Sequence, residues 1–456
     1  MAAYDVIVIG GGPGGYMAAE KAGGAGLKTL SIEDKHYGGT CLNEGCIPTK
    51  TLLNSGKAYL HAKEGEAFGV IASDVKLDHS KVIDRKENVI KTLVNGVKAG
   101  VKASKCEMAD GFGRLAGRNS EGYVVKVGDK EYTGKNIIIA SGSHCFIPPF
   151  IKGIQEGIDA GFVMTNVEAL ECRELPKKLA VLGGGIIGLE MATYFAMAGV
   201  EVTVLEMLDH VGGPNDVECT KILQKNLEKF GMKFMLGAKV TAVNKDSVSY
   251  ELGGRTEEIK ADKVLLSIGR KANVAGLGLE EMGIVTERGA IVTDEHMQTN
   301  LPNIYAVGDC NGKLMLAHTA YREADVAVNN ILGKRDRMRY DAIPSVLYTV
   351  PELSMVGKME EQCRKEGLDV KVVKLPMVYS GRYIAENTVT DGIAKMVFDK
   401  KYGTLLGATF LCNYSSEFIS AAAICVEMGL TASDIKKMVF PHPTVAEIMR
   451  EAVDKF

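Results

Sequence analysis

The same glycine-rich pattern occurs twice in the chain, each time between a short apolar strand and a helix. The first copy lies in YDVIVIGGGPGGYMAAEKA and has the spacing GxGxxG at Gly10, Gly12 and Gly15. The second copy lies in KLAVLGGGIIGLEMATYFAMAG and repeats this spacing at Gly183, Gly185 and Gly188. In such a turn the first glycine permits a tight bend, the second lets the backbone approach a diphosphate, and the third lets helix pack on strand. The diphosphate then binds at the N-terminus of the helix.

Each copy is followed by an acidic residue at the end of a second predicted strand. Glu33 lies 23 residues after Gly10, and Glu206 lies 23 residues after Gly183. A carboxylate at this place can accept hydrogen bonds from ribose hydroxyls. A glycine-rich turn without a ligand would be a fair interpretation of one copy, but two complete copies at one spacing favour two bound dinucleotides. Glu206 would repel a 2′-phosphate, and no arginine follows it in MLDH, so the second site is predicted to prefer NAD.

Two further strand-to-glycine segments suggest how the domains are arranged. NIIIASGS contains Gly142, and TNLPNIYAVGDC ends beside Asp309, and these segments follow the first and second dinucleotide units respectively. A turn-forming Asp is the simpler interpretation of Asp309 by itself. We predict an α/β fold with two Rossmann-like dinucleotide-binding domains and a C-terminal α+β domain. The predicted boundaries are a discontinuous first domain at 1–145 and 270–335, a second domain at 146–269, and a third domain at 336–456.

Composition excludes several classes of protein. With 456 residues and a formal net charge of −3, the chain has no basic excess that would favour nucleic acid or an anionic membrane. No apolar run approaches the roughly 20 residues that span a bilayer, and the first residues lead directly into a strand rather than a signal peptide. The ten cysteines are scattered, which favours a reducing, cytoplasmic location over a disulfide scaffold. Apolar residues at helical spacing predict a helix over 80–101 that packs into the core of the first domain.

One close pair of cysteines stands out, Cys41 and Cys46 in GGTCLNEGCIPTK. A zinc site would need about four ligands, and no matching His or Cys cluster lies nearby, so we expect no metal. Two interpretations of the pair remain, namely two ordinary buried thiols and a redox couple. A disulfide between them requires a distorted turn, because an ideal helix would separate the two Cα atoms by about 7.5 Å along its axis. Gly45 permits that distortion, and Pro48 suits the first turn of a following helix.

A redox couple would also decide which cofactor occupies each site. A nicotinamide transfers a hydride, whereas a disulfide is opened by thiolate attack, and a flavin can react with both. The first dinucleotide unit leads into the cysteines, so it is predicted to bind FAD, and the second unit is predicted to bind NAD.

At this point the chain resembles the flavoprotein disulfide reductase family over essentially its whole length. The resemblance rests on GGTCLNEGCIPTK, the two GxGxxG units, AVGD and HPTVAE. It implies that Cys41 exchanges with the substrate sulfur, that Cys46 lies beside the flavin, and that Lys50 lies near the flavin and pairs with Glu190. It also assigns further residues to cofactor binding, namely Gly142, Asp309 and Ala317.

The segment FPHPTVAEIMREA supplies a candidate base, His442, and an orienting carboxylate, Glu447. A neutral imidazole can take the proton of a thiol near neutral pH. Thr444 and Glu447 could equally form a capping box, and a His between two prolines could be only a turn residue. In the family the equivalent histidine reaches the disulfide of the other subunit, so the resemblance implies a homodimer. The His442–Pro443 bond is a candidate cis peptide.

Within the family, the resemblance points to members that oxidise protein-bound dihydrolipoamide with NAD. The implied partner is a lipoyl-carrying protein of a 2-oxo acid dehydrogenase or glycine cleavage complex. Two alternatives stay open. One is an NAD(P)H-dependent reductase of glutathione or another small disulfide, and the other is a non-catalytic NAD-sensing subunit of a complex.

Overall fold

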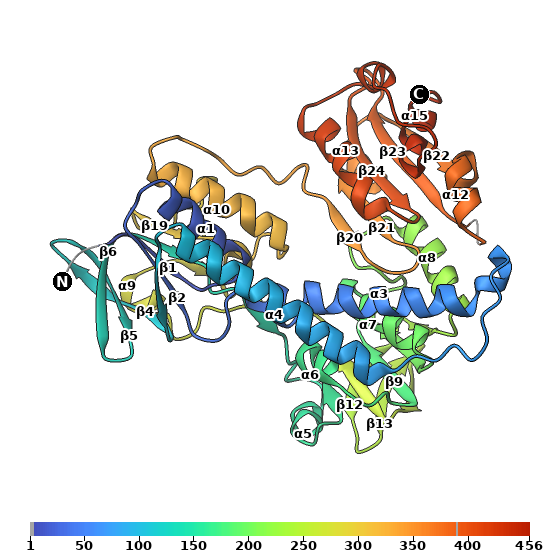
Figure 1. Ribbon diagram of the computed structural model, residues 1–456, viewed down its shortest axis with the longest axis horizontal. Coiled ribbons are helices and arrows are strands. Elements are labelled where there is room, and N and C mark those ends of the chain that lie inside the picture. The colour runs from blue at the N-terminus through green and yellow to red at the C-terminus, as the bar shows by residue number, and fades with distance from the viewer. Residues whose placement is uncertain (1–3, 389–390) are drawn as a thin grey trace. The chain divides into compact units, whose positions relative to one another are not determined.

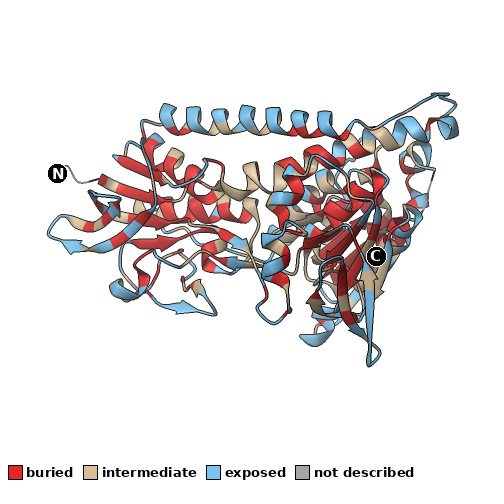
Figure 2. Ribbon diagram, turned by 90° about the horizontal axis from the view of Figure 1, so that it is seen from below, coloured by how far each residue is buried: buried red, intermediate tan, exposed pale blue. Residues whose placement is uncertain are grey.

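The computed structural model describes residues 4–388 and 391–456, which form two compact units. Unit 1 contains Met1–Thr51, Ile83–Phe146 and Gly269–Arg339. Unit 2 contains Leu52–Val82, Ile147–Ile268 and Tyr340–Phe456. The predicted second and third domains thus fall largely in one unit, and the predicted three-domain boundaries stay a prediction. Buried residues gather on the strands of the main sheets (Figure 2).

Unit 1 is built on a seven-stranded sheet in the order β3-β2-β1-β6-β5-β4, with β19 paired to β6. The pairs among β1, β2, β3, β6 and β19 are parallel, and β4, β5 and β6 are antiparallel. The strands are β1 (Tyr4–Ile9), β2 (Thr29–Glu33), β3 (Glu107–Asp110), β4 (Gly113–Asn119), β5 (Gly122–Val127), β6 (Lys130–Ile139) and β19 (Ile304–Ala306). Helices α1 (Pro13–Gly24) and α10 (Ala317–Ile331) pack against each other beside this sheet (Figure 1).

Smaller elements complete unit 1. They are α2 (Gly39–Asn43), β7 (Ser143–Cys145), β16 (Arg270–Ala272), α9 (Leu279–Met282), β17 (Thr286–Glu287), β18 (Ala290–Ile291) and the 3-10 turn η2 (Gly308–Asn311). Two long helices, α3 (Cys46–Lys63) and α4 (His79–Ala103), have residues in both units, and the 3-10 turn η1 (Gly65–Phe68) lies between them.

Unit 2 contains a parallel five-stranded sheet in the order β11-β10-β9-β15-β8. Its strands are β8 (Val163–Met164), β9 (Lys178–Leu182), β10 (Glu201–Glu206), β11 (Lys233–Leu236) and β15 (Lys263–Leu266). An antiparallel sheet of β12 (Lys239–Val243), β13 (Ser247–Leu252) and β14 (Arg255–Lys260) is inserted before β15. The helices of this part are α5 (Ile154–Asp159), α6 (Asn166–Glu171), α7 (Ile186–Met197) and α8 (Val217–Lys229).

The C-terminal part of unit 2 has an antiparallel sheet in the order β20-β21-β24-β23-β22. Its strands are β20 (Ser345–Leu347), β21 (Leu353–Gly357), β22 (Val370–Pro376), β23 (Ile393–Asp399) and β24 (Leu405–Leu411). The elements around it are α11 (Glu360–Lys365), η3 (Met377–Tyr379), α12 (Gly381–Glu386), α13 (Ser415–Glu427), α14 (Ala432–Lys436), η4 (Val445–Glu447) and α15 (Ile448–Val453). The expected mixture of strands and helices is confirmed.

The helix predicted over 80–101 is present as α4, but its predicted burial is wrong for much of its length. Val82, Ile83 and Val101 are buried, whereas Leu93 is 39% exposed. The other apolar residues of the pattern, Val89, Ile90, Val94 and Val97, are only partly buried. Helical periodicity identifies an apolar face, but it does not show whether a neighbour covers that face along the whole helix.

Candidate active site and dinucleotide-binding turns

The two glycine turns have nearly the same backbone. Gly10 has φ +107° and Gly183 has φ +99°, a region that residues with a side chain rarely adopt. A Cβ on Gly10 would lie 2.2 Å from the Ala140 carbonyl oxygen, and one on Gly183 would lie 2.7 Å from that of Ser267. The first glycine of each motif is therefore required by the turn itself.

The second and third glycines of each motif meet different surroundings. A Cβ on Gly15 would lie 1.8 Å from the Gly10 carbonyl oxygen, and one on Gly188 would lie 2.2 Å from that of Gly183. By contrast, a Cβ on Gly12 would meet nothing closer than 3.7 Å, and one on Gly185 would meet nothing within 4 Å. The third glycine is required for packing of the helix, while the second leaves open space above the helix N-terminus.

The acidic residue after each turn binds back to it. Glu33 Oε2 accepts a hydrogen bond from Gly11 N at 2.6 Å, and Glu206 Oε2 accepts one from Gly184 N at 2.7 Å. The other oxygen of Glu33 accepts from Lys35 N at 2.8 Å and from His36 N at 3.1 Å. Burial raises the pKa of Glu33 above its ordinary value, against these hydrogen bonds.

Both turns fit a dinucleotide by the chemistry of their groups. The N-terminal N–H groups of α1 and α7 face the open space beside Gly12 and Gly185, which suits a diphosphate. A carboxylate offers about four acceptor positions. Glu206 uses one of them for Gly184 and one, at 2.8 Å, for Leu208 N, so it keeps capacity for ribose hydroxyls.

The two close cysteines lie on either side of a break between helices. Cys41 is in α2, α2 ends at Asn43, and Cys46 is the first residue of α3. Gly45 lies in this break, as the sequence predicted, and Pro48 lies in the first turn of α3. Both cysteines are thiols in this structure. The two side chains are direct neighbours, since they form a hydrogen bond with each other. This hydrogen bond is the largest of the effects that raise the pKa of Cys41.

Charges around the thiols have opposite effects on Cys41. Burial also raises the pKa of Cys41, whereas the positive charge of Lys50 lowers it and the negative charge of Asp309 raises it. Lys50 and Asp309 are thus close enough to interact with this thiol. Three of the sequence-predicted residues of unit 1, Cys46, Lys50 and Asp309, thus interact with Cys41, and their predicted roles stay predictions.

Asp309 is held by side chains that the sequence analysis missed. Its Oδ2 accepts a hydrogen bond from Ser143 Oγ at 2.5 Å, and Ser143 Oγ accepts one from Arg270 Nε at 2.7 Å. Gly142, with φ +73°, directly precedes this serine, and Ala317 begins α10. The signal for Arg270 was its place in SIGRKAN, directly after Gly269 and shortly after the end of β15, which resembles the two other strand-to-glycine segments.

A buried carboxylate and a tyrosine pair were also missed. Glu323 is fully buried, and its Oε2 accepts from Gly308 N at 2.6 Å and from Asn311 Nδ2 at 2.9 Å, which fixes the turn that carries Asp309. The hydroxyls of Tyr16 and Tyr321 are 2.6 Å apart. Burial raises the pKa of both tyrosines, and an electrostatic interaction with Cys41 adds to this effect, which places the pair near the thiols.

His442 and Glu447 interact directly. His442 Nδ1 lies 2.9 Å from Glu447 Oε1, and Glu447 Oε2 accepts from Thr444 N at 2.6 Å. The glutamate therefore serves both interpretations of the sequence, since one oxygen orients the histidine and the other binds the start of the last helical segment. Burial alone would raise the pKa of Glu447, but these two hydrogen bonds outweigh burial and lower it. The His442 side chain is 83% exposed, and its bond to Pro443 is cis, as predicted.

Glu190 lies in α7, two residues after Gly188, and is only 3% exposed. Its Oε1 accepts a hydrogen bond from Tyr348 N at 3.0 Å, which links the nucleotide-binding helix to the segment after β20. The pairing of Glu190 with Lys50 involves both units and stays a prediction, as does the approach of His442 to Cys41.

Two features are absent from the part of the chain that the structure describes. In residues 4–388 and 391–456, no group of three or more His, Cys, Asp or Glu side chains is arranged to hold a metal ion. Over the same ranges, no helix combines the length and the apolar character that crossing a bilayer requires.

Two dinucleotide-binding turns, each at the end of a strand with parallel neighbours and one of them leading into neighbouring thiols, define a dinucleotide-dependent oxidoreductase of the disulfide class. Comparison with known proteins gives the family. The sequence model described as pyridine nucleotide-disulphide oxidoreductase matches residues 4–324, and that of the dimerisation domain of the same family matches residues 343–453. The chain belongs to the pyridine nucleotide-disulphide oxidoreductase family, and membership implies FAD and NAD(P) as cofactors and supports a homodimer.

Several relatives are similar over nearly the full length. The chain is 38% identical to a dihydrolipoyl dehydrogenase of Mycoplasma pneumoniae, covering 99% of this chain and 98% of the relative. It is 40% identical to the human mitochondrial dihydrolipoyl dehydrogenase, covering 98% and 89% respectively. Among solved structures, the Escherichia coli flavoprotein disulfide reductase RclA is 30% identical with a TM-score of 0.87, and covers all of both chains. LpdA from Mycobacterium tuberculosis, at 24% identity and a TM-score of 0.89, shows the same fold.

Proposed function

We propose that the protein is an NAD-linked dihydrolipoyl dehydrogenase, which oxidises protein-bound dihydrolipoamide to lipoamide. The observation that carries the proposal is the direct neighbourhood of Cys41 and Cys46 at the start of α3, with Lys50 close by. Full-length similarity to proteins named dihydrolipoyl dehydrogenase supports the choice of substrate. The reaction converts a dithiol and NAD⁺ into a cyclic disulfide, NADH and one proton.

In the proposed chemistry, a substrate thiolate attacks the Cys41 sulfur of a Cys41–Cys46 disulfide. The S–S bond breaks, Cys46 leaves as a thiolate, and a mixed disulfide joins Cys41 to the substrate. The second substrate thiol then attacks the substrate sulfur of this bond, which releases Cys41 and closes the lipoyl ring. The substrate has lost two electrons and two protons, and the enzyme holds a dithiol.

His442 is the proposed base that takes the substrate thiol protons, and Glu447 orients it through the 2.9 Å contact. Because the His442 side chain is exposed and lies in the segment that matches the family's dimerisation domain, we propose that it acts on the dithiol of the other subunit. The first dinucleotide turn is proposed to hold FAD, which supplies a two-electron carrier between dithiol and nicotinamide. The second is proposed to hold NAD through Gly185 and Glu206.

The proposed partner is a lipoyl-carrying protein, and the proposed location is the cytoplasm. RclA is named a flavoprotein disulfide reductase, so reduction of another disulfide is the competing activity within the same family. The decisive comparison measures kcat/KM for dihydrolipoamide with NAD and with NADP, and for glutathione disulfide with NADH and NADPH. Dihydrolipoamide with NAD should give the highest value, and a higher value for glutathione disulfide would refute the proposed substrate.

Cysteine variants test the chemistry separately from the substrate. Cys41→Ser and Cys46→Ser should each lower dihydrolipoamide turnover by about a thousandfold or more, because each removes one atom of the exchanging disulfide. Cys172→Ser is the matched control, since the Cys172 Sγ donates to the Glu174 carbonyl oxygen, which a serine hydroxyl can also do. Full turnover by Cys41→Ser would contradict the assigned chemistry.

A further inference from the structure

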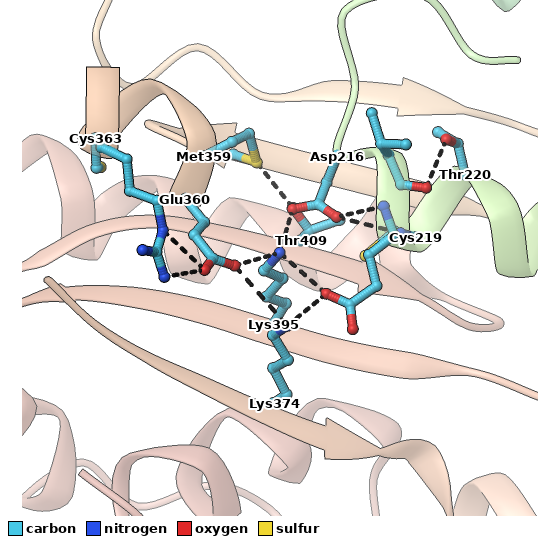
Figure 3. A network of polar contacts seen from close by, with 12 residues as sticks. Asp216, Cys219, Thr220, Met359, Glu360, Cys363, Lys374, Lys395 and Thr409 are labelled. Carbon is cyan, nitrogen blue, oxygen red and sulfur yellow. Dashed lines mark hydrogen bonds and ion pairs between the residues drawn. The ribbon is translucent and has the colours of Figure 1, made fainter. Parts of the chain in front are cut away.

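A buried lysine joins the C-terminal sheet to the second dinucleotide unit. Lys395, on β23, is 5% exposed, and its Nζ lies 2.7 Å from Asp216 Oδ2, 2.9 Å from Glu360 Oε2 and 3.2 Å from Glu218 Oε2 (Figure 3). Asp216 and Glu218 belong to the start of α8, which follows the acidic strand end of the second unit. The contact therefore links residues 179 positions apart in the chain.

Strand alternation explains why a lysine can occupy this central strand. Ala394, Met396 and Phe398 lie in the apolar core together with residues of α13 and α15. Lys395 lies on the other face of the sheet, between Lys374 on β22 and Thr409 on β24. That face of the sheet is in contact with α8, so the ammonium group meets the carboxylates at its N-terminus.

The cluster around Lys395 is balanced in charge. Its cations are Lys395, Lys374 and Arg364, and its carboxylates are Asp216, Glu218 and Glu360. Lys374 Nζ lies 2.7 Å from Glu218 Oε2, and an Arg364 guanidinium nitrogen lies 2.7 Å from Glu360 Oε1. Burial alone would lower the pKa of Lys395, but hydrogen bonds to Asp216 and Glu360 raise it. Removing one partner of such a buried group leaves an uncompensated charge, so the cluster constrains the geometry strongly.

Asp216 has two roles in one carboxylate. Its Oδ1 caps α8 by accepting from Glu218 N at 3.1 Å and from Cys219 N at 3.2 Å, while its Oδ2 binds Lys395 (Figure 3). Asp216 itself is 7% exposed. The position of the first turn of α8 is thus set by a lysine from the sheet.

Asn215, which directly precedes Asp216 in the chain, begins a series of hydrogen bonds that leads to the second glycine turn. The Asn215 side chain donates to the Gly212 carbonyl oxygen, and Gly212 N donates to the Gly184 carbonyl oxygen at 2.7 Å. Gly184 N in turn donates to Glu206, the acidic residue of the motif. Thr220, in the first turn of α8, packs against Gly212, where a Cβ would lie 2.8 Å from its methyl group. The loop 207–215 is held between the cluster and the glycine turn.

We propose that Lys395 is a positioning residue of the second dinucleotide site, which holds the loop 207–215 against the glycine turn and so sets the affinity for the nicotinamide dinucleotide. This inference rests on the proposed function, which assigns NAD to that turn. It assigns a role in nucleotide binding to a residue of the segment that matches the dimerisation domain.

The test uses the FAD-loaded enzyme and NADH as the probe. Lys395→Met removes the charge while keeping most of the side-chain volume. Asp216→Asn is the milder variant, because asparagine caps a helix about as well as aspartate but offers Lys395 no charge. Lys229→Met is the control, since Lys229 forms an exposed ion pair with Asp391 at 2.6 Å at the other end of α8.

Lys395→Met and Asp216→Asn should each raise the Kd for NADH by about tenfold, within the range typical of coupling between sites, with kcat at saturating NADH and FAD content close to wild type. Without NADH, amides of 207–215 should exchange hydrogen faster in both variants, while amides of 34–38, the corresponding loop of the first unit, should not. Lys395→Arg should recover part of the affinity, and Lys229→Met should match wild type. If Lys395→Met does not fold, the Kd for NADH and the hydrogen exchange of Asp216→Asn alone test the proposal.

Wild-type Kd for NADH and wild-type exchange of 207–215 in Asp216→Asn would overturn the role of Lys395. A wild-type enzyme that binds no NADH would instead refute the proposed function. A loss of FAD together with a uniform loss of protection in Asp216→Asn would show that the cluster only stabilises the fold, and would also overturn the proposal.

Discussion

In the first dinucleotide unit the chain returns from Glu33 to the glycine turn at Gly38, whose N–H donates to the Gly11 carbonyl oxygen at 2.8 Å. In the second unit it returns from Glu206 at Gly212, whose N–H donates to the Gly184 carbonyl oxygen at 2.7 Å. Up to this point the two dinucleotide units share this backbone hydrogen bond and the hydrogen bond from the glycine turn to the acidic residue. Beyond it they differ, because the first continues into α2 and the thiols, and the second into α8 and the Lys395 cluster.

The difference changes the space above each glycine turn. In the first unit Gly39 packs so closely that a Cβ on it would lie 2.6 Å from Gly12 Cα. In the second unit a Cβ on Gly185 would meet nothing within 4 Å. At the equivalent position in the first unit, a Cβ on Gly12 would lie 3.7 Å from Gly39 Cα, so the segment that leads to the thiols bounds the space beside Gly12, whereas the space beside Gly185 is open. The same motif thus gives two different sites through the segment that follows it.

The prediction with the largest expected effect concerns a feature that both glycine turns share, the close packing of the helix against the turn at the third glycine. Gly15→Ala and Gly188→Ala should each lower the free energy of unfolding by about 3 kcal/mol, because the new methyl group would press on a backbone carbonyl. Chemical denaturation measures the loss. Gly24→Ala, on the same helix as Gly15 but with nothing within 4 Å, is the control and should be neutral or slightly stabilising. If Gly15→Ala were as stable as Gly24→Ala, the close packing of helix on turn would be wrong.

The second prediction tests the Lys395 cluster, which is found only beside the second dinucleotide unit. Hydrogen bonds to Lys395 and Arg364 hold the pKa of Glu360 at about 2, below its ordinary 4.5. A lowered carboxyl pKa stabilises the fold above pH 4.5, and this contribution is lost as the pH falls towards 2. At pH 7, Glu360→Gln should be less stable than wild type by about 2 kcal/mol, with the difference shrinking between pH 4.5 and 2. A difference that does not change with pH would contradict the ion pair.

The third prediction concerns the open second glycine. At Gly185 and Gly12, φ is −77° and −72°, which alanine adopts without strain. Gly185→Ala should therefore fold normally but raise the Kd for NADH by about tenfold, about 1.4 kcal/mol, because the methyl group occupies the diphosphate space. Gly12→Ala should weaken retention of FAD instead. A fluorescence titration with NADH and the flavin content after gel filtration separate the two, and unaltered NADH binding by Gly185→Ala would break the assignment of the second turn.

The smallest effect concerns the choice of nicotinamide dinucleotide. Glu206→Ala should reduce the preference for NADH over NADPH by about fivefold, about 1 kcal/mol, because it removes both the ribose acceptor and the repulsion of a 2′-phosphate. Glu201→Ala, at the exposed start of the same strand β10, is the matched control. A ratio of the two Kd values that stayed at its wild-type value in Glu206→Ala would show that the preference, if any, comes from elsewhere.

Local sequence patterns predicted the strands and helices around both glycine turns, because strand, turn and helix are encoded within about 30 residues. The break between Cys41 and Cys46 was predicted for the same reason, since an ideal helix cannot bring the two sulfurs together. The burial of α4 was predicted wrongly, because the exposure of a residue such as Leu93 depends on whether a segment distant in the sequence covers it. The assignment of FAD and NAD to particular turns stays a prediction.

Contacts between distant segments were beyond the sequence. A lysine in IAKMVFD resembles any solvent-facing strand residue, and only the fold shows that Asp216 and Glu360 enclose it. The contacts of Arg270 with Ser143 and of Glu323 with Gly308 were missed for the same reason, since the partners lie in other segments. Both contacts of Glu447 are local and were considered from the sequence. The two competing interpretations, orientation of His442 and capping of the last helical segment, each describe one of its two carboxylate oxygens.

The central claim is that two electrons pass between a nicotinamide dinucleotide and the Cys41–Cys46 pair. The most direct measurement counts thiols in the denatured protein before and after anaerobic treatment of the FAD-loaded enzyme with one equivalent of NADH. The chain has ten cysteines, so an oxidised pair leaves eight thiols, and the NADH-treated enzyme should show all ten. In Cys46→Ser the count should stay the same before and after. An unchanged count in the wild-type enzyme would contradict the account.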